Sequence, residues 1–198
     1  MHGYSGRILH IDLRQGEVKI DTFDEAFAQT YLGGNGFASR LLHDRLAPGI
    51  DPVAPENMIV FAVGPTTDTL VPGATRCCAA TKSPLAGLFF DSTFGGMFAA
   101  VQKRAGFEAV SIVGQSDTLM YVLIHEDGAE LNLQATCGGS TREPPISQSS
   151  NARMPVRKCC RSDLLGKTAC VMPAPYLPGK KSRDGVAAGS GLSWARHI

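Results

Sequence analysis

Alternation of apolar and polar side chains predicts most of the secondary structure in the first part of the chain. Residues 7–13 (RILHIDL) alternate, and so do residues 17–21 after a turn at 14–16, which predicts a β-hairpin. The run at 58–63 (MIVFAV) is apolar throughout, as in a strand that is buried on both faces. Further strands are predicted at 76–81, 88–91, 110–113, 121–124 and 130–133.

Helical spacing interrupts these strands in three places. Residues 24–32 carry acidic side chains in their first turn, residues 37–46 repeat leucines at helical spacing, and residues 96–105 follow a pair of glycines. The segment 33–36 (GGNG) follows a helix rather than a strand, so a helix C-cap is the better interpretation than a dinucleotide-binding loop. Dominant strands with helices between groups of them predict an α+β fold rather than a doubly wound sheet.

The charge of the chain changes sign near residue 137, although the net charge of the whole is only +1. Residues 1–136 carry 15 acidic and 9 basic side chains, whereas residues 137–198 carry 3 and 10. The second part has 6 of the 12 prolines and no helical or strand periodicity, which disfavours a packed core. We therefore predict a structured domain at 1–136 and a poorly structured, basic, Pro/Gly-rich tail at 137–198.

Composition and charge exclude several function classes. No apolar run is long enough to cross a membrane, and the N-terminus does not read as a signal peptide, so the expected compartment is the cytoplasm. The near-neutral balance, and a tail without interleaved aromatic residues, do not favour binding to nucleic acid. None of the six cysteines has the Cys-x-x-Cys spacing of zinc or iron–sulfur sites, which favours buried or incidental thiols. The five scattered histidines indicate neither metal ligands nor catalytic residues.

One segment suggests a binding site for an anion. Residues 90–97 pass from a strand through Gly95 and Gly96 into a helix, and such a junction exposes backbone N–H groups at the positive end of the helix dipole. Arg76, which follows a glycine loop and precedes a strand, can hold a phosphate with its planar guanidinium, although a solvated strand-edge charge is the simpler interpretation. Lys82 is a third basic candidate, and an ordinary loop lysine is the alternative there.

Several blocks in order resemble the N-terminal domain of the aldehyde ferredoxin oxidoreductase family, and the resemblance covers roughly residues 3–136. The blocks are Tyr4-x-Gly6-Arg7 with the strands after it, Leu32-Gly33-Gly34-Asn35-Gly36, Pro55-Glu56-Asn57 with the following strand that ends in Gly64-Pro65, Arg76, Thr81-Lys82-Ser83-Pro84-Leu85-x-Gly87, Gly95-Gly96-x-Phe98 and Lys103-x-Ala105-Gly106-Phe107.

This resemblance implies a tungsten or molybdenum ion that is held by two pterin dithiolenes beside a four-iron (4Fe-4S) cluster. It implies oxidation of aldehydes or related low-potential steps, with electrons passed to a ferredoxin-like carrier. The cofactor would face Arg76 and the turn Thr93, Phe94, Gly95 and Gly96, and pterin phosphates suit an arginine and a helix N-terminus. The family's cluster-binding cysteines and later catalytic groups have no counterpart in this chain, so the resemblance assigns no catalytic residue and no metal ligand here.

The chain also departs from the family pattern. Thr93 stands where the family usually has asparagine, Phe94 where it has a small residue that leaves room for the ligand, and Asp68 where a small residue is commoner. The tail lacks the family's second cofactor-binding block, and we hypothesise a change of reading frame near Cys137, which the DNA sequence would test.

The resemblance and these departures leave three interpretations open. The chain is part of an oxidoreductase that is inactive alone, or a cofactor-binding subunit or carrier that pairs with a larger iron–sulfur chain or with a second copy, or a remnant without a ligand.

Overall fold

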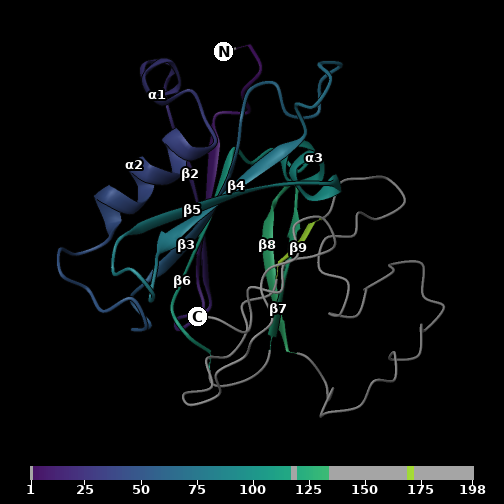
Figure 1. Cartoon of the computed structure of the whole chain (residues 1–198). Coiled ribbons are helices and arrows are strands. Elements are labelled where there is room, and N and C mark those ends of the chain that lie inside the picture. The colour runs from purple at the N-terminus through teal and green to yellow at the C-terminus, as the bar shows by residue number, and fades with distance from the viewer. Residues whose placement is uncertain (1, 117–119, 134–168, 172–198) are drawn as a thin grey trace.

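The computed structural model describes residues 2–116, 120–133 and 169–171 (Figure 1). Its helices are α1 (Glu25–Tyr31), α2 (Asn35–Arg45) and α3 (Met97–Arg104). Its strands are β1 (Arg7–Asp12), β2 (Glu17–Thr22), β3 (Met58–Val63), β4 (Arg76–Lys82), β5 (Phe89–Gly95), β6 (Ala109–Val113), β7 (Met120–His125), β8 (Gly128–Leu133) and β9 (Ala169–Val171). Strands predominate, and the predicted α+β class is confirmed.

Six strands form one mixed sheet in the order β2-β1-β6-β3-β4-β5. β1 and β6 run parallel, and every other neighbouring pair of this sheet is antiparallel. α2 covers one face of the sheet, while α3 and a second, smaller sheet lie on the opposite face (Figure 1). The order leaves β2 and β5 at the two edges.

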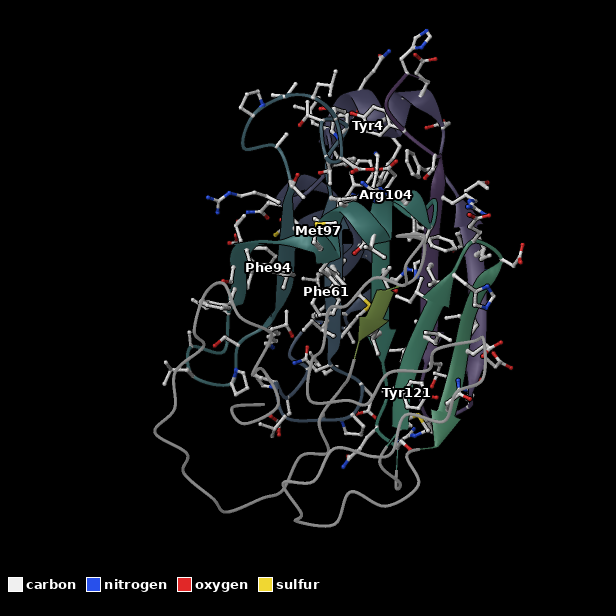
Figure 2. The ribbon with its side chains drawn as sticks, turned by 90° about the vertical axis from the view of Figure 1, so that its right-hand side faces the viewer. Tyr4, Phe61, Phe94, Met97, Arg104 and Tyr121 are labelled. Atoms are coloured by element: carbon white, nitrogen blue, oxygen red, sulfur yellow. The ribbon has the colours of Figure 1, made fainter. Side chains whose placement is uncertain are left out.

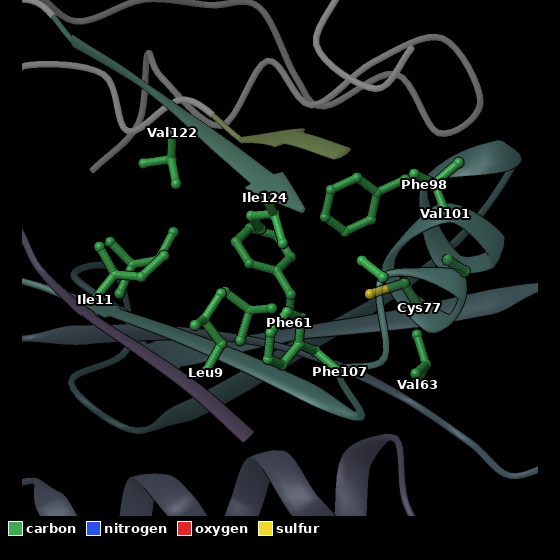
Figure 3. Close-up of a cluster of buried hydrophobic side chains, with 14 of the residues drawn as sticks. Leu9, Ile11, Phe61, Val63, Cys77, Phe98, Val101, Phe107, Val122 and Ile124 are labelled. Carbon is green, nitrogen blue, oxygen red and sulfur yellow. The ribbon is translucent and has the colours of Figure 1, made fainter. Parts of the chain in front are cut away.

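Each face of the sheet carries its own hydrophobic core. On the α2 face, Phe37 and Leu41 pack with sheet residues such as Val60. On the opposite face, Phe98 of α3 and Ile124 of β7 close over a larger cluster (Figure 3). Burying one side chain of this size stabilises the fold by roughly 1.5–3 kcal/mol, so both layers contribute substantially.

The pattern of the central strands explains this three-layer arrangement. Successive side chains of a strand point to opposite faces, and in β3 Val60 and Ala62 face α2 while Phe61 and Val63 face α3. A strand that is covered on both faces needs apolar residues at every position, and this is why the run 58–63 is continuous rather than alternating.

The second sheet has the order β8-β7-β9, and both of its pairs are antiparallel. β9 lies within the stretch 137–198, and its three residues pair with β7. The rest of the predicted tail lies outside the described residues. No described helix is long and apolar enough to cross a membrane.

The break between α1 and α2 has a clear steric reason. Gly33 has φ 121°, and a Cβ placed there would lie 2.8 Å from the carbonyl oxygen of Val63. Glycine is therefore required where this connection passes the end of β3. α2 begins at Asn35, two residues before the predicted start, and Gly34 precedes it as the N-cap.

Candidate functional site

The structure brings together two segments that the sequence proposes for anion binding. Arg76 begins β4 and Gly95 ends β5, and these two residues are direct partners in the antiparallel register. Arg76 is exposed, and among the described residues its guanidinium has no hydrogen bond or ion pair. A free guanidinium beside a glycine backbone leaves its N–H donors available to an anionic ligand.

The N-terminal end of α3 follows directly after this pair. Gly96 is the N-cap, with φ 104° and ψ −173°, and no side chain caps the helix. The first-turn N–H groups of α3 therefore have no side-chain acceptor at an exposed end of the helix. No atom of the described residues lies within 4 Å of the Cβ position of Gly96, so they leave its backbone open to a ligand. The start of α3 and Arg76 lie at the same exposed end of β4 and β5, although the Arg76 side chain belongs to the α2 face of the sheet and α3 lies on the opposite face.

The boundary of the predicted turn at Thr93–Gly96 is wrong, because β5 continues through Gly95 and leaves only Gly96 between strand and helix. Phe94 points toward α3, where its ring lies 6.5 Å from that of Phe61 and 5.8 Å from that of Phe98, centroid to centroid (Figure 2). Its side chain therefore belongs to the core and does not lie beside Arg76. Thr93 is exposed and shares the opposite face with Arg76 and Gly95, because side chains alternate along a strand.

The loop 64–75 before β4 contributes a residue that the sequence analysis does not single out. Thr67 is buried, and its hydroxyl accepts a hydrogen bond from the N–H of Gly64 at 3.2 Å and lies 3.5 Å from the carbonyl oxygen of Arg76. This side chain joins the two ends of the loop and thereby fixes where β4 starts. Nothing in the spacing of the local sequence indicates that role, because it depends on a contact across nine residues.

The paired cysteines of β4 are structural. Cys77 and Cys78 are free thiols, they are buried, and they belong to the cores on opposite faces of the sheet. Burial raises the pKa of Cys78 to about 11, and the nearby Asp91 adds to the effect, so this thiol is protonated at neutral pH. Burial also raises the pKa of Cys77. Two buried thiols on opposite faces of the sheet cannot ligate one cluster, and the described residues contain no group of three or more histidine, cysteine, aspartate or glutamate side chains that could hold a metal ion.

Lys82, the third basic candidate, is engaged within the fold. Its ammonium group donates to the carbonyl oxygen of Ile50 at 2.6 Å, and its backbone carbonyl accepts from Asn57 at 3.0 Å. Lys82 ends β4, and Arg76 begins it. The structure therefore separates Lys82 from the Arg76 region by the length of the strand and gives it a role in holding the loop 47–57.

A buried cluster on the α2 face contains histidine, serine and aspartate, the residue types of a hydrolytic triad. His10 and Ser111 are 8% and 3% exposed, and their ring nitrogen Nδ1 and hydroxyl are hydrogen-bonded. Arg45 donates from Nη2 to both His10 Nε2 and Asp21 Oδ2, each at 2.9 Å. Burial and then the Arg45 guanidinium lower the pKa of His10 to about 4. With both ring nitrogens occupied and the serine buried, this cluster supports the fold and is no candidate for catalysis.

Comparison with known proteins places this geometry in a family. The family model described as "Aldehyde ferredoxin oxidoreductase, N-terminal domain" matches residues 8–145. The tungsten-containing aldehyde ferredoxin oxidoreductase of Pyrococcus abyssi is 41% identical over 131 residues, which cover 66% of this chain and 22% of the relative. The aliphatic sulfonate oxidoreductase WOR-like subunit of Pyrococcus furiosus is 28% identical over 134 residues, which cover 66% of this chain and 21% of that protein.

A solved structure shares the fold. A chain of the active site complex BamBC of benzoyl coenzyme A reductase, in complex with 1,5-dienoyl-CoA, superposes with a TM-score of 0.64 at 32% sequence identity. The match covers 67% of this chain and 20% of that one. The present chain thus spans about a fifth of the length of the relatives that it matches.

Proposed function

The chain belongs to the aldehyde ferredoxin oxidoreductase family, in which it corresponds to the N-terminal domain, and from this premise we propose that it binds the pterin of a tungsten- or molybdenum-containing oxidoreductase. The observation that carries the proposal is the register pair of Arg76 and Gly95 directly before the uncapped start of α3. The anionic part of a bound pterin would meet the Arg76 guanidinium and the amides that follow Gly96. Thr93 would offer a hydroxyl from the same face, and Phe94 would contribute only backbone.

The chemistry of the described residues fits a phosphate-bearing cofactor and does not fit a protein-ligated metal. A free guanidinium and uncapped amides are the groups that bind phosphate. Because the described residues offer no metal-binding cluster, the metal would be held by the pterin dithiolenes. When bound, that group supplies two-electron redox chemistry on aldehyde or oxo substrates. A four-iron cluster has no suitable ligands in Cys77 and Cys78.

The proposed domain is inactive alone. Electron transfer to a ferredoxin-like carrier needs an iron–sulfur centre, and the described residues do not supply one. The expected setting is the cytoplasm. The alternative function is a cofactor-binding subunit or carrier that pairs with a separate iron–sulfur chain or with a second copy. The edge strand β5 favours it. Phe89 and Phe90 at its start are 47% and 46% exposed, and Leu88 just before it is 69% exposed, and exposed apolar edges are typical of contact surfaces.

Cofactor analysis of the purified chain tests the proposal. The chain would be produced in a host that makes tungsten- and molybdenum-pterins, and metal content and pterin fluorescence would be measured for the wild type and for Arg76→Gln. We expect pterin in the wild type and at least a tenfold loss in the variant. Arg14→Gln, which removes a positive charge from an exposed side chain elsewhere, serves as the matched control. Equal pterin content in the wild type and Arg76→Gln would overturn the proposed site, and copurification with a larger iron–sulfur chain would favour the subunit alternative.

A further inference from the structure

An ion pair with two parallel hydrogen bonds connects the loop 64–75 to α3. Arg104 donates to Asp68 from Nε to Oδ2 and from Nη2 to Oδ1, and both distances are 2.7 Å. Arg104 lies in the last turn of α3 (Figure 2). Hydrogen bonding to Asp68 raises the pKa of Arg104. Two planar groups that meet in this way define the orientation of the loop relative to the helix, as well as the distance between them.

The backbone at Asp68 is unusual for a residue with a side chain. Asp68 has φ 62°, a left-handed conformation that glycine adopts most easily and that aspartate tolerates better than most residues. The left-handed backbone at Asp68 is less favourable for aspartate than for glycine, but only the aspartate can form the ion pair with Arg104.

The loop contacts α3 at the C-terminal end of the helix and β5 at the end of that strand. In the last turn of the helix, Lys103 Nζ lies 3.3 Å from the carbonyl oxygen of Gly64, and Asp68 is paired with Arg104. At the other end of the loop, the carbonyl oxygen of Thr75 lies 3.9 Å from the Cβ position of Gly95, the last residue of β5. The loop is therefore held at α3 and leads directly into Arg76 beside Gly95. Thr67, the neighbour of Asp68, contacts the carbonyl of Arg76 directly.

We propose that Asp68, through its ion pair with Arg104, is a positioning residue that fixes the loop before β4 and with it the place of Arg76 beside Gly95 and Gly96. This inference rests on the proposed anion site and names a determinant of it that lies outside the site. A purely structural role is the competing explanation. The two side chains are 24% and 42% exposed, and exposed ion pairs contribute little to stability, so that explanation predicts small changes in stability and none in ligand binding.

Inorganic pyrophosphate is a suitable probe for the test, because it presents the same phosphate oxygens as the proposed cofactor. Binding to the full chain would be followed through the NMR shifts of the Gly95 and Gly96 amides at constant ionic strength. We expect Asp68→Asn to weaken binding three- to tenfold. The direction of the change in affinity is informative. If charge alone mattered, removing the negative charge of Asp68 would strengthen anion binding, whereas loss of positioning weakens it. Glu56→Gln makes the same change of charge at a distant, exposed pair and serves as the control.

Two further variants separate geometry from charge and from folding. Arg104→Lys keeps the positive charge but loses the planar fork, and we expect it to weaken pyrophosphate binding by a similar factor. Asp68→Gly relieves the left-handed conformation, so it is expected to fold at least as stably as the wild type and still to bind more weakly.

The positioning role is overturned if pyrophosphate binds as well as to the wild type in all three variants, Asp68→Asn, Asp68→Gly and Arg104→Lys. If Arg76→Gln clearly loses pyrophosphate binding in the same experiment, the anion site itself still stands. If Arg76→Gln also binds like the wild type, the proposed site itself fails, and the positioning role fails with it.

Discussion

Polar side chains are buried and paired in one region of the six-stranded sheet and exposed in another. We call the residues around Glu108 and around His10 the closed side. Glu108 is fully buried there, and it accepts two hydrogen bonds from Lys103 Nζ, at 2.7 and 2.6 Å, and one from the backbone N–H of Ser5 at 2.7 Å. In the second region, the open edge, Arg76, Thr93, Gly95 and Gly96 are all exposed, and the Arg76 guanidinium has no partner among the described residues.

The contrast shows how to separate structural from functional polar residues. Burying a charge is costly unless it is paired, so the closed side must satisfy its groups internally and gains stability when it does. An exposed arginine and an uncapped helix start are solvated in the free protein, and their donors stay available to a ligand. Changes to the closed side should therefore affect folding, whereas changes to the open edge should affect binding.

Removing the buried carboxylate should produce the largest effect. Glu108→Ala leaves Lys103, whose side chain is 14% exposed, as an unpaired charge, and we expect the free energy of unfolding to fall by about 3–5 kcal/mol. The double variant Lys103→Met with Glu108→Leu should cost clearly less, because no charge is left without a partner. Urea unfolding of both variants measures this. An equal loss in the single and double variants would show that the ion pair is not the cause.

The His10 cluster should make stability depend on pH. The pKa of His10 is about 4 in the fold against an ordinary value of 6.5, so the neutral form stabilises the native state above pH 6.5. That stabilisation is lost as the pH falls from 6.5 toward 4, and in full it amounts to about 3 kcal/mol. Unfolding measured at pH 7 and pH 4.5 should show this loss in the wild type, and a smaller one in His10→Asn, which does not titrate. Identical losses in both proteins would contradict the assignment.

At the open edge, stability should depend on the backbone of a single residue. Gly96→Ala places a side chain at φ 104°, and the strain is expected to cost about 1–3 kcal/mol although the space around it is free. Gly95→Ala is the matched control, because Gly95 lies in ordinary strand conformation with only one atom within 4 Å of its Cβ position, and it should change stability little. Thermal unfolding compares the two. A larger loss of stability in Gly95→Ala than in Gly96→Ala would contradict the assignment of backbone strain to Gly96.

Arg76→Gln should have the smallest effect on folding and the largest on binding. The side chain is exposed and forms no ion pair with the described residues, so we expect a change in stability of less than about 0.5 kcal/mol. The same variant should lose pterin in the cofactor analysis. A marked loss of stability would show that Arg76 supports the fold, as the residues of the closed side do.

The element pattern was predictable because it depends on local periodicity. The run 58–63 became β3 with the predicted bounds, and the helix expected at 24–32 became α1, with Asp24 as the N-cap whose carboxylate accepts a hydrogen bond from the Phe27 N–H. The end of β5 was not predictable. Two glycines directly after Phe94 indicate a turn, and only pairing with β4 extends the strand to Gly95.

Arg76, Gly95 and Gly96 were recognisable as an anion-binding set from residue types and from the family resemblance. Their proximity was not, because nineteen positions separate Arg76 from Gly95 in the chain and only a strand register makes them partners. The same limit applies to Asp68 and Arg104, to Thr67 and Arg76, and to the core position of the Phe94 ring. Residue type and short-range spacing indicate which hydrogen-bonding and charged groups a segment carries. Which groups meet, and which remain free for a ligand, depends on long-range packing that satisfies buried charges and leaves exposed ones to the solvent.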